Sequence, residues 1–132
     1  MNRPSLLLRG LWHALGVAMI AVIALLTLSP SDSPLLVFSL WDKAMHFFGH
    51  AALSAWYALG VGRERVPTLL LAVVVFGVIL ELAQHCVPGR ASELWDVVAN
   101  SLGAIAGAAL GLTPWRHGLA WVDRALVQRA GR

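Results

Sequence analysis

The chain has 132 residues, of which 58% are hydrophobic and only 13% are charged. A soluble domain averages about 25% charged residues, so this composition leaves too little polar surface to cover a water-soluble globule. The length suits one compact bundle. The net charge of +3 comes from dispersed basic residues without interleaved aromatic ones, which argues against a nucleic-acid-binding face.

The first apolar run extends from Leu11 to Leu28 without a full charge. That length meets the requirement of about 20 residues for a helix that crosses a bilayer core. Because Arg3 and Arg9 precede the run, a cleaved signal peptide is the alternative. The segment from Thr27 to Pro30 lacks a small-x-small cleavage pattern, so we expect an uncleaved first helix, followed by a loop over residues 29–39.

Three further apolar runs follow, at residues 40–60, 66–87 and 92–112. The second is the least apolar because polar residues recur along it. The third is rich in β-branched residues, but its total length favours a helix over a buried strand. Ser92 is expected to be the N-cap of the fourth helix. The sequence therefore predicts an all-α, polytopic membrane protein with a bundle of four transmembrane helices in residues 1–114.

The tail, residues 115–132, has a different pattern. Apolar residues recur there at intervals of three and four residues, with Arg124 and other polar residues on the opposite side. This pattern is typical of a basic amphipathic helix that lies in the lipid headgroup layer. A helix that binds a soluble partner is the alternative.

The basic residues also predict the orientation of the four spans. An even number of spans places both termini on one side, and eight of the ten basic residues fall on that side, leaving only Lys43 and Arg90 on the other. Because cytoplasmic loops are enriched in Lys and Arg, both termini are expected in the cytoplasm. The expected location is the bacterial inner membrane.

Polar residues recur on three of the predicted helices, near their outer ends. On the second, Asp42 or Lys43 shares a stripe with His46, His50, Ser54 and Tyr57; on the third, Glu81, Gln84 and His85 share a face; on the fourth, Asp96 and Asn100 are followed by a ladder of Gly103, Gly107 and Gly111. At a rise of about 1.5 Å per residue, these polar groups reach similar depths. A polar group in a membrane helix usually faces protein, so we expect one shared site. The glycine ladder predicts close helix packing, within the chain or in a dimer.

These residues also carry a resemblance. The segment Asp42-Lys43-Ala44-Met45-His46-Phe47 resembles the D-K-x-x-H-F signature of VanZ-like membrane proteins. Glu81 to Gln84, then Pro88-Gly89-Arg90, then Asp96 to Gly103 resemble that family's E-L-x-Q, P-G-R and D-x-x-A-N-x-x-G segments. The family is named after a protein linked to teicoplanin resistance. The resemblance implies a small multi-helix membrane protein, without an established biochemical mechanism.

The polar cluster has several interpretations at this stage. No cofactor is expected, and a metal ion held by His46, His50, Glu81 and Asp96 is not favoured because the H-E-x-x-H pattern is absent. Lys43 or Arg90 is expected to neutralise the nearby carboxylates.

We expect the cluster to bind an amphiphile of the cell envelope, either a lipid-linked intermediate or a lipoglycopeptide. A membrane-embedded acid–base enzyme and a purely structural network are the alternatives; the enzyme question stays open, and a non-enzymatic protein is favoured. The expected partners are membrane lipids, and the sequence does not fix the oligomeric state. The residues assigned to the ligand site or polar network are Asp42, Lys43, His46, Glu81, Gln84, Arg90, Asp96 and Asn100.

Overall fold

The computed structural model describes residues 6–30, 40–90 and 92–130, and these are entirely helical apart from turns. The expected loop at residues 29–39 lies outside the described residues except for its first two. The main helices are α1 (Leu6–Leu28), α2 (Leu40–Ala58), α3 (Val66–Gln84), α4 (Leu94–Ala108) and α5 (Gly118–Ala130). Short 3₁₀ turns, at Arg63–Arg65, Ala109–Leu112 and Pro114–His117, lead into α3, extend α4 and precede α5.

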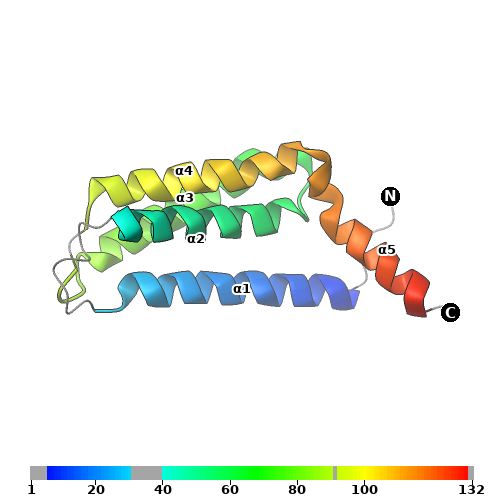
Figure 1. The fold of residues 1–132 in the computed structure, drawn as a ribbon, viewed down its shortest axis with the longest axis horizontal. Coiled ribbons are helices and arrows are strands. Elements are labelled where there is room, and N and C mark those ends of the chain that lie inside the picture. Colours follow the sequence, from blue (N-terminus) through cyan, green and yellow to red (C-terminus); the bar gives the residue numbers. More distant parts are fainter. Residues whose placement is uncertain (1–5, 31–39, 91, 131–132) are drawn as a thin grey trace.

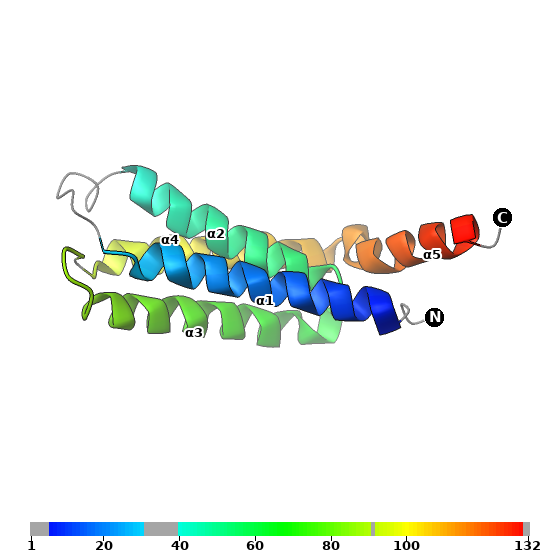
Figure 2. The same ribbon diagram turned by 90° about the horizontal axis from the view of Figure 1, so that it is seen from below.

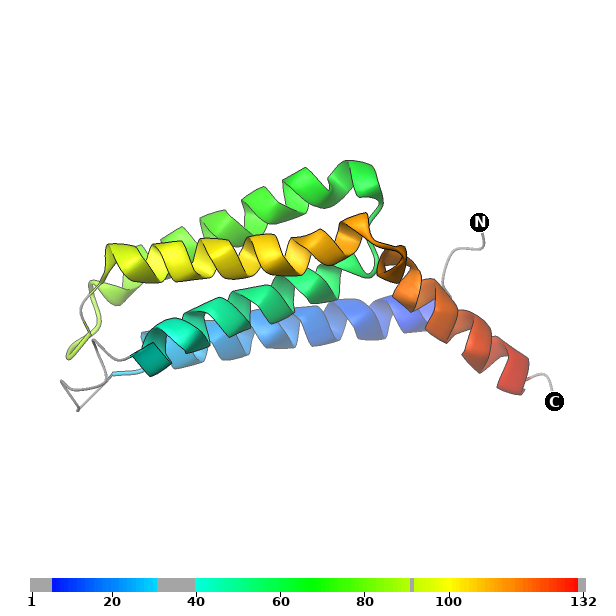
Figure 3. The ribbon, with the colours of Figure 1, turned by 45° about the horizontal axis from the view of Figure 1, so that its top comes forward.

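Helices α1 to α4 run side by side as an up-and-down bundle (Figure 1). The ends of α1 and α3 and the beginnings of α2 and α4 lie together at one end of this bundle, which we call the polar end (Figures 1 and 3). Helix α5 leads away from the opposite end. In Figure 2, α2 diverges from α1 towards the polar end, so the two helices are farthest apart beside the residues that the sequence analysis selected.

Three helical segments among the described residues are long and apolar enough to cross a membrane: Leu8–Leu28, Arg63–Gln84 and Leu94–Leu112. Helix α2 does not reach this hydropathy because its first three turns contain Asp42, Lys43 and two histidines. The all-α membrane fold is therefore confirmed in its coarser form, with three apolar segments rather than four.

The distribution of side chains is inverted relative to a soluble protein. The apolar core is small, with Leu53, Val73 and Ala104 fully buried at its centre. Large apolar side chains instead lie on the outside, including Leu25 at 69% exposure and Leu71 at 63%. Polar side chains fill much of the interior. The buried polar residues are Thr27, His46, His50, Ser54, Glu81, Gln84, Asp96 and Asn100.

The glycine ladder of α4 packs against other parts of the same chain. A Cβ atom added to Gly103 would overlap the backbone carbonyl oxygen of Phe47, and one added to Gly107 would overlap that of Ala51. Gly111 meets the side chain of Val66 instead. The first two glycines thus let the backbones of α2 and α4 approach closely, which fixes the relative height of the polar residues on the two helices.

The far end of the bundle is fastened by a reciprocal pair of tryptophans. The indole Nε1–H of Trp12 donates to the carbonyl oxygen of Trp56 at 3.2 Å, and that of Trp56 donates to the carbonyl oxygen of Trp12 at 3.0 Å. Arg63 donates from its guanidinium to the carbonyl oxygen of Leu112 at 2.9 Å. These bonds join α1 to α2 and the start of α3 to the end of α4, so the helices are held together in pairs at this end.

Candidate functional site

Lys43 joins α2 to the first turn of α4. Its Nζ lies 2.7 Å from Oε2 of Glu93 and 3.1 Å from Oδ1 of Asp96. The Asp96 side chain is only 2% exposed, whereas that of Lys43 is 26% exposed. A buried carboxylate without a countercharge is costly, so Lys43 is the main reason that Asp96 can face the interior as a charged group.

His46 lies one turn deeper and also bridges to α4. Its Nδ1 is 3.1 Å from Oδ1 of Asn100, and its Nε2 is 3.7 Å from Oδ2 of Asp42. The first distance is that of a hydrogen bond and the second is too long for one. One ligand atom each from Asp42, His46 and Asp96 lies within 4.8 Å of the others, which makes these three the candidate metal ligands among the described residues.

Arg90 ties the end of α1 to the start of α2. Its Nε–H donates to the carbonyl oxygen of Ser29 at 3.0 Å, and one terminal nitrogen donates to that of Leu26 at 3.2 Å. The other terminal nitrogen donates to Oδ1 of Asp42 at 3.4 Å. Leu26 belongs to the last turn of α1, where carbonyl oxygens have no partner within the helix, and Ser29 directly follows that turn. Arg90 therefore caps α1, and its remaining N–H groups stay available to a ligand.

Arg90 follows Gly89, whose φ of 76° is the only positive one among the described residues. A side chain at this position would strain the backbone. The glycine therefore allows the tight turn that returns Arg90 to the bundle.

Glu81 provides the cap of α4 from the neighbouring helix. Its Oε1 accepts a hydrogen bond of 2.7 Å from the backbone N–H of Glu93. The residue before the first turn of α4 is Glu93 itself, and no side chain within that segment caps it. The prediction that Ser92 is the N-cap is therefore wrong. A buried carboxylate from α3 performs that task, while the side chain of Ser92 is exposed. A negative charge at a helix N-terminus is also favoured by the helix dipole.

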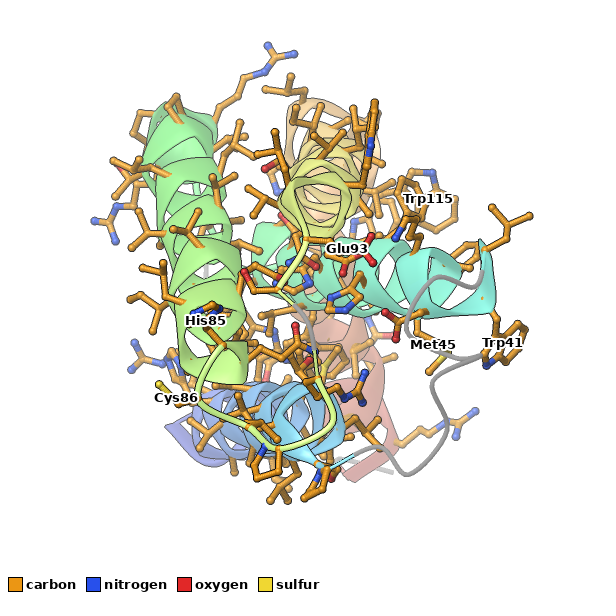
Figure 4. The ribbon with its side chains drawn as sticks, turned by 90° about the vertical axis from the view of Figure 1, so that its left-hand side faces the viewer. Trp41, Met45, His85, Cys86, Glu93 and Trp115 are labelled. Atoms are coloured by element: carbon orange, nitrogen blue, oxygen red, sulfur yellow. The ribbon has the colours of Figure 1, made fainter. Side chains whose placement is uncertain are left out.

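Gln84 joins α3 to α1. Its Nε2 donates to the carbonyl oxygen of Thr27 at 3.1 Å, and both residues are buried. His85, which was expected to share the face of Glu81 and Gln84, is exposed at the end of α3 (Figure 4). The helix ends at Gln84, so the interior face of α3 ends before His85.

Deeper in the bundle, several polar atoms are buried without a hydrogen-bond partner. The Nδ1–H of His50 donates to the carbonyl oxygen of His46 at 3.0 Å, while its Nε2 has no partner. A Cβ atom on Gly77 would lie 3.0 Å from that Nε2 and 3.3 Å from Nδ2 of Asn100, which also lacks a partner. The absence of a side chain on Gly77 thus lets α3 pack closely against these two polar atoms.

A cavity of about 120 Å³ lies between α1 and α2 at the polar end. A single water needs about 10–15 Å³ on this scale. Its polar lining comes from Asp42, His46, His50, Thr27 and Arg90, and its apolar lining comes from Ile23, Leu26, Met45 and Phe48, with Gly49 between them. Leu26, Met45 and Phe48 are about half exposed or more, so the cavity reaches the side of the bundle.

The structure brings the eight selected polar residues together at the polar end. Contacts run from Arg90 through Asp42 and His46 to Asn100 on α4. Lys43 pairs separately with Asp96, and Gln84 with the carbonyl oxygen of Thr27 on α1. Figure 4, which looks along the bundle from this end, shows Glu93 between α4 and α2, whereas Trp41 and Met45 project outwards from α2. Glu93 was missing from the selection. The sequence places Glu93 one turn before Asp96, which would have suggested it. Its contact with Lys43, fifty residues earlier, depends on the packing of α2 against α4.

Comparison with known families gives one match. The family model described as VanZ/LLP1 matches residues 7–114 of this chain. The match thus covers α1 to α4 and the 3₁₀ turn that follows, and it ends before α5. No curated protein and no solved structure matches the chain.

Proposed function

Because this chain belongs to the VanZ/LLP1 family, we propose that it is a membrane protein that binds an amphiphile of the cell envelope at its polar end. The observation that supports this proposal is the cavity between α1 and α2. Its lining combines the polar groups of Asp42, His46 and Arg90 with the apolar side chains of Leu26, Met45 and Phe48, which are about half exposed or more. A polar headgroup beside the first three residues, with a hydrocarbon chain along the exposed apolar ones, matches this lining.

The ligand class follows from the chemistry of the lining. The available guanidinium N–H groups of Arg90 suit a phosphate or carboxylate, and the half-buried Asp42 beside them suits a sugar hydroxyl or an amine. A lipid-linked intermediate of envelope synthesis has both a phosphate and a long chain. A lipoglycopeptide such as teicoplanin has a carboxylate, sugars and an acyl chain, and it is the second probe of the same chemistry.

We further propose that α2 crosses the membrane together with the three apolar segments, which makes a bundle of four spans. Two features support this: α2 runs alongside α4 over most of its length (Figure 1), and its charged groups pair within the bundle. If the protein lies in a bacterial inner membrane with both termini in the cytoplasm, the polar end is at the periplasmic side. The single cysteine of the chain tests this orientation, because Cys86 is exposed at the polar end (Figure 4).

A membrane-impermeant maleimide should therefore label Cys86 in intact spheroplasts. The matched control combines Cys86→Ser with Arg129→Cys, which moves the thiol to an exposed position on α5, where labelling should require permeabilised cells. The opposite pattern contradicts the orientation.

Helix α5 is proposed to lie in the cytoplasmic headgroup layer. Its Trp121, Val122 and Leu126 are 42%, 50% and 51% exposed, and Trp115, just before the helix, is 62% exposed. These apolar groups have no covering element in the described part of the chain, and Arg124 and Arg129 accompany them. A helix with apolar and basic residues of this kind binds the surface of anionic membranes.

The amphiphile proposal is tested by filling the cavity. A Cβ atom on Gly49 would meet only Ile23, at 3.6 Å, so Gly49→Leu places a side chain in the cavity without displacing a backbone. Gly10→Leu is the matched control because a Cβ there has nothing within 4 Å. Native mass spectrometry of the full chain, released from phosphatidylcholine nanodiscs, would measure retained undecaprenyl phosphate, undecaprenol or teicoplanin.

We expect undecaprenyl phosphate to be retained more strongly than undecaprenol, which lacks the phosphate. Gly49→Leu should weaken that retention about tenfold or more, equivalent to 1.4 kcal/mol, while Gly10→Leu should leave it unchanged. Stronger retention of teicoplanin would select the lipoglycopeptide. Equal retention by the wild type and Gly49→Leu, with both folded, contradicts the proposal. That result favours a purely structural network, which the pairing of Lys43 with Asp96 and of Arg90 with Asp42 would support.

A further inference from the structure

The polar end contains a set of metal-ligand atoms that neither the family match nor the proposed amphiphile pocket assigns to a metal. Asp42 and His46 lie one turn apart on α2, and Asp96 approaches them from α4, with one ligand atom of each within 4.8 Å of the others. We propose that these three side chains bind one divalent transition-metal ion, of which Zn²⁺ is the representative. The proposal does not depend on amphiphile binding.

The hydrogen bonding of His46 prepares it for this role. With the amide of Asn100 oriented as in the structure, Oδ1 can only accept, so Nδ1 of His46 carries the proton of their 3.1 Å hydrogen bond. The lone pair of a neutral His46 is then on Nε2, which faces Oδ2 of Asp42 at 3.7 Å. A lone pair and a carboxylate oxygen repel each other unless a proton or a metal cation lies between them. Metal-ligating histidines typically donate their other N–H to such an oxygen.

A second, independent observation is the excess of carboxylates. Four carboxylates of this end lie beside only two permanent cations, Lys43 and Arg90, so the groups present leave room for a further cation. The fourth member, Glu81, is only 3% exposed and its Oε2 has no hydrogen-bond partner. Glu81 lies close enough to interact electrostatically with all three proposed ligands. The four carboxylates are those of Asp42, Glu81, Glu93 and Asp96.

The donor types and distances decide the class of metal. One imidazole nitrogen with two carboxylate oxygens favours zinc and similar ions over magnesium and calcium, which prefer oxygen alone. Zinc bonds are about 2.0–2.2 Å long. To reach this distance from a common centre, each of the three ligand atoms has to move inwards by less than about 1 Å. Asp42 is half-buried and can supply that movement, while Lys43 keeps its pairing with Glu93. Three protein ligands leave a fourth position open, as in catalytic zinc sites.

The test measures metal binding directly, in detergent and without any amphiphile. The full chain, purified through a tag without histidine and stripped with chelator, is titrated with Co²⁺, whose visible absorption reports coordination, and then with Zn²⁺ as competitor. We expect one ion per chain. His46→Gln and Asp96→Asn should each weaken Co²⁺ binding by more than about 100-fold. Asn100→Ala removes only the hydrogen-bond partner of His46, so it should weaken Co²⁺ binding about 10–100-fold.

His85→Gln is the matched control because it makes the same change in an exposed histidine at the same end of the bundle. It should bind Co²⁺ as the wild type does. If His46→Gln does not yield folded protein, Asp42→Asn replaces it with the same expectation. Absence of stoichiometric binding by the wild type, equal binding by a folded ligand variant, or an equal loss in His85→Gln overturns the proposal.

The result is separable from that of the amphiphile experiment. Gly49→Leu changes no ligand atom and should keep wild-type Co²⁺ binding even where it loses undecaprenyl phosphate. If the wild type binds Co²⁺ but does not retain lipid, only the amphiphile proposal is contradicted. If the wild type retains lipid but does not bind Co²⁺, only the metal proposal is contradicted.

Discussion

The close approach of α2 and α4 at Gly107 leads to a quantitative prediction. A Cβ atom at Gly107 would overlap the carbonyl oxygen of Ala51, and it would lie 2.7 Å from the backbone nitrogen of Ala55 and 2.9 Å from Cβ of Ser54. Because backbone atoms cannot move aside singly, Gly107→Ala forces the two helices apart. Overpacking of this kind costs about 1–3 kcal/mol, and more when the surroundings are rigid.

The same substitution also brings a gain. Alanine stabilises a helix by up to about 1 kcal/mol relative to glycine. Taking the upper cost against this gain, Gly107→Ala should lower the free energy of unfolding by about 2 kcal/mol. Gly49→Ala and Gly10→Ala obtain the helix gain without an overlap, so they should be neutral or stabilising by up to about 1 kcal/mol.

The assay is reversible denaturation in mixed micelles, followed by circular dichroism, on the three variants and the wild type. Gly103→Ala, which meets the backbone of Phe47, should behave like Gly107→Ala. If Gly107→Ala is as stable as Gly49→Ala, the two helices do not approach as closely as the structure has them, and the alignment of the polar residues loses its basis.

Two further predictions concern the polar end, and both are measured by the same unfolding assay. Lys43→Met removes the countercharge of the buried Asp96 and should lower the free energy of unfolding by about 3 kcal/mol, the low end for a broken buried pair, because Lys43 is partly exposed. A second change, Asp96→Asn, should restore part of this stability. An unchanged stability of Lys43→Met contradicts the pairing. Glu81→Ala leaves the backbone N–H of Glu93 without its acceptor and should cost about 1–3 kcal/mol, whereas Glu81→Gln keeps an acceptor oxygen and should cost less. Equal losses in the two Glu81 variants contradict the capping role.

Much of the fold could be predicted because helix length and hydropathy are local properties. The starts of α2 and α3, and the end of the segment after α4, fall at or next to the expected residues. The ladder of Gly103 and Gly107 indicated a close packing partner. From the sequence, this partner could have been another helix of the same chain or a second copy of the chain. In the structure it is α2 of the same chain. The choice depends on three-dimensional packing, which glycine spacing does not specify.

The pairing within the polar end was less predictable. Residues at helical spacing could be assigned to one face, and this worked for His46 and His50, which are both buried. It failed for His85, because the sequence does not show that α3 ends at the residue before it. Arg90 was expected to neutralise a nearby carboxylate, and it pairs with Asp42. Its hydrogen bonds to the end of α1 were not expected, because they depend on the turn at Gly89, which directs the chain across the bundle.

The capping of α4 could not have been predicted from local sequence rules. Those rules select Ser92 because a hydroxyl before a helix is a common N-cap. They do not consider a carboxylate twelve residues earlier on another helix, which is where Glu81 lies. In a membrane interior this arrangement is favourable, because Oε1 of Glu81 and the backbone N–H of Glu93 satisfy each other away from water.

The central claim is that side chains from separate helices meet in one site at the polar end, and a double-mutant cycle between Lys43 on α2 and Asp96 on α4 tests it most directly. Groups in contact couple by about 0.5–3 kcal/mol, whereas distant ones add within about 0.5 kcal/mol. The 3.1 Å contact predicts a coupling of at least about 1 kcal/mol for Lys43→Met with Asp96→Asn. The control cycle pairs Lys43→Met with Glu64→Gln, an exposed position at the opposite end, and should show none. A Lys43–Asp96 coupling as small as that of the control would contradict the account.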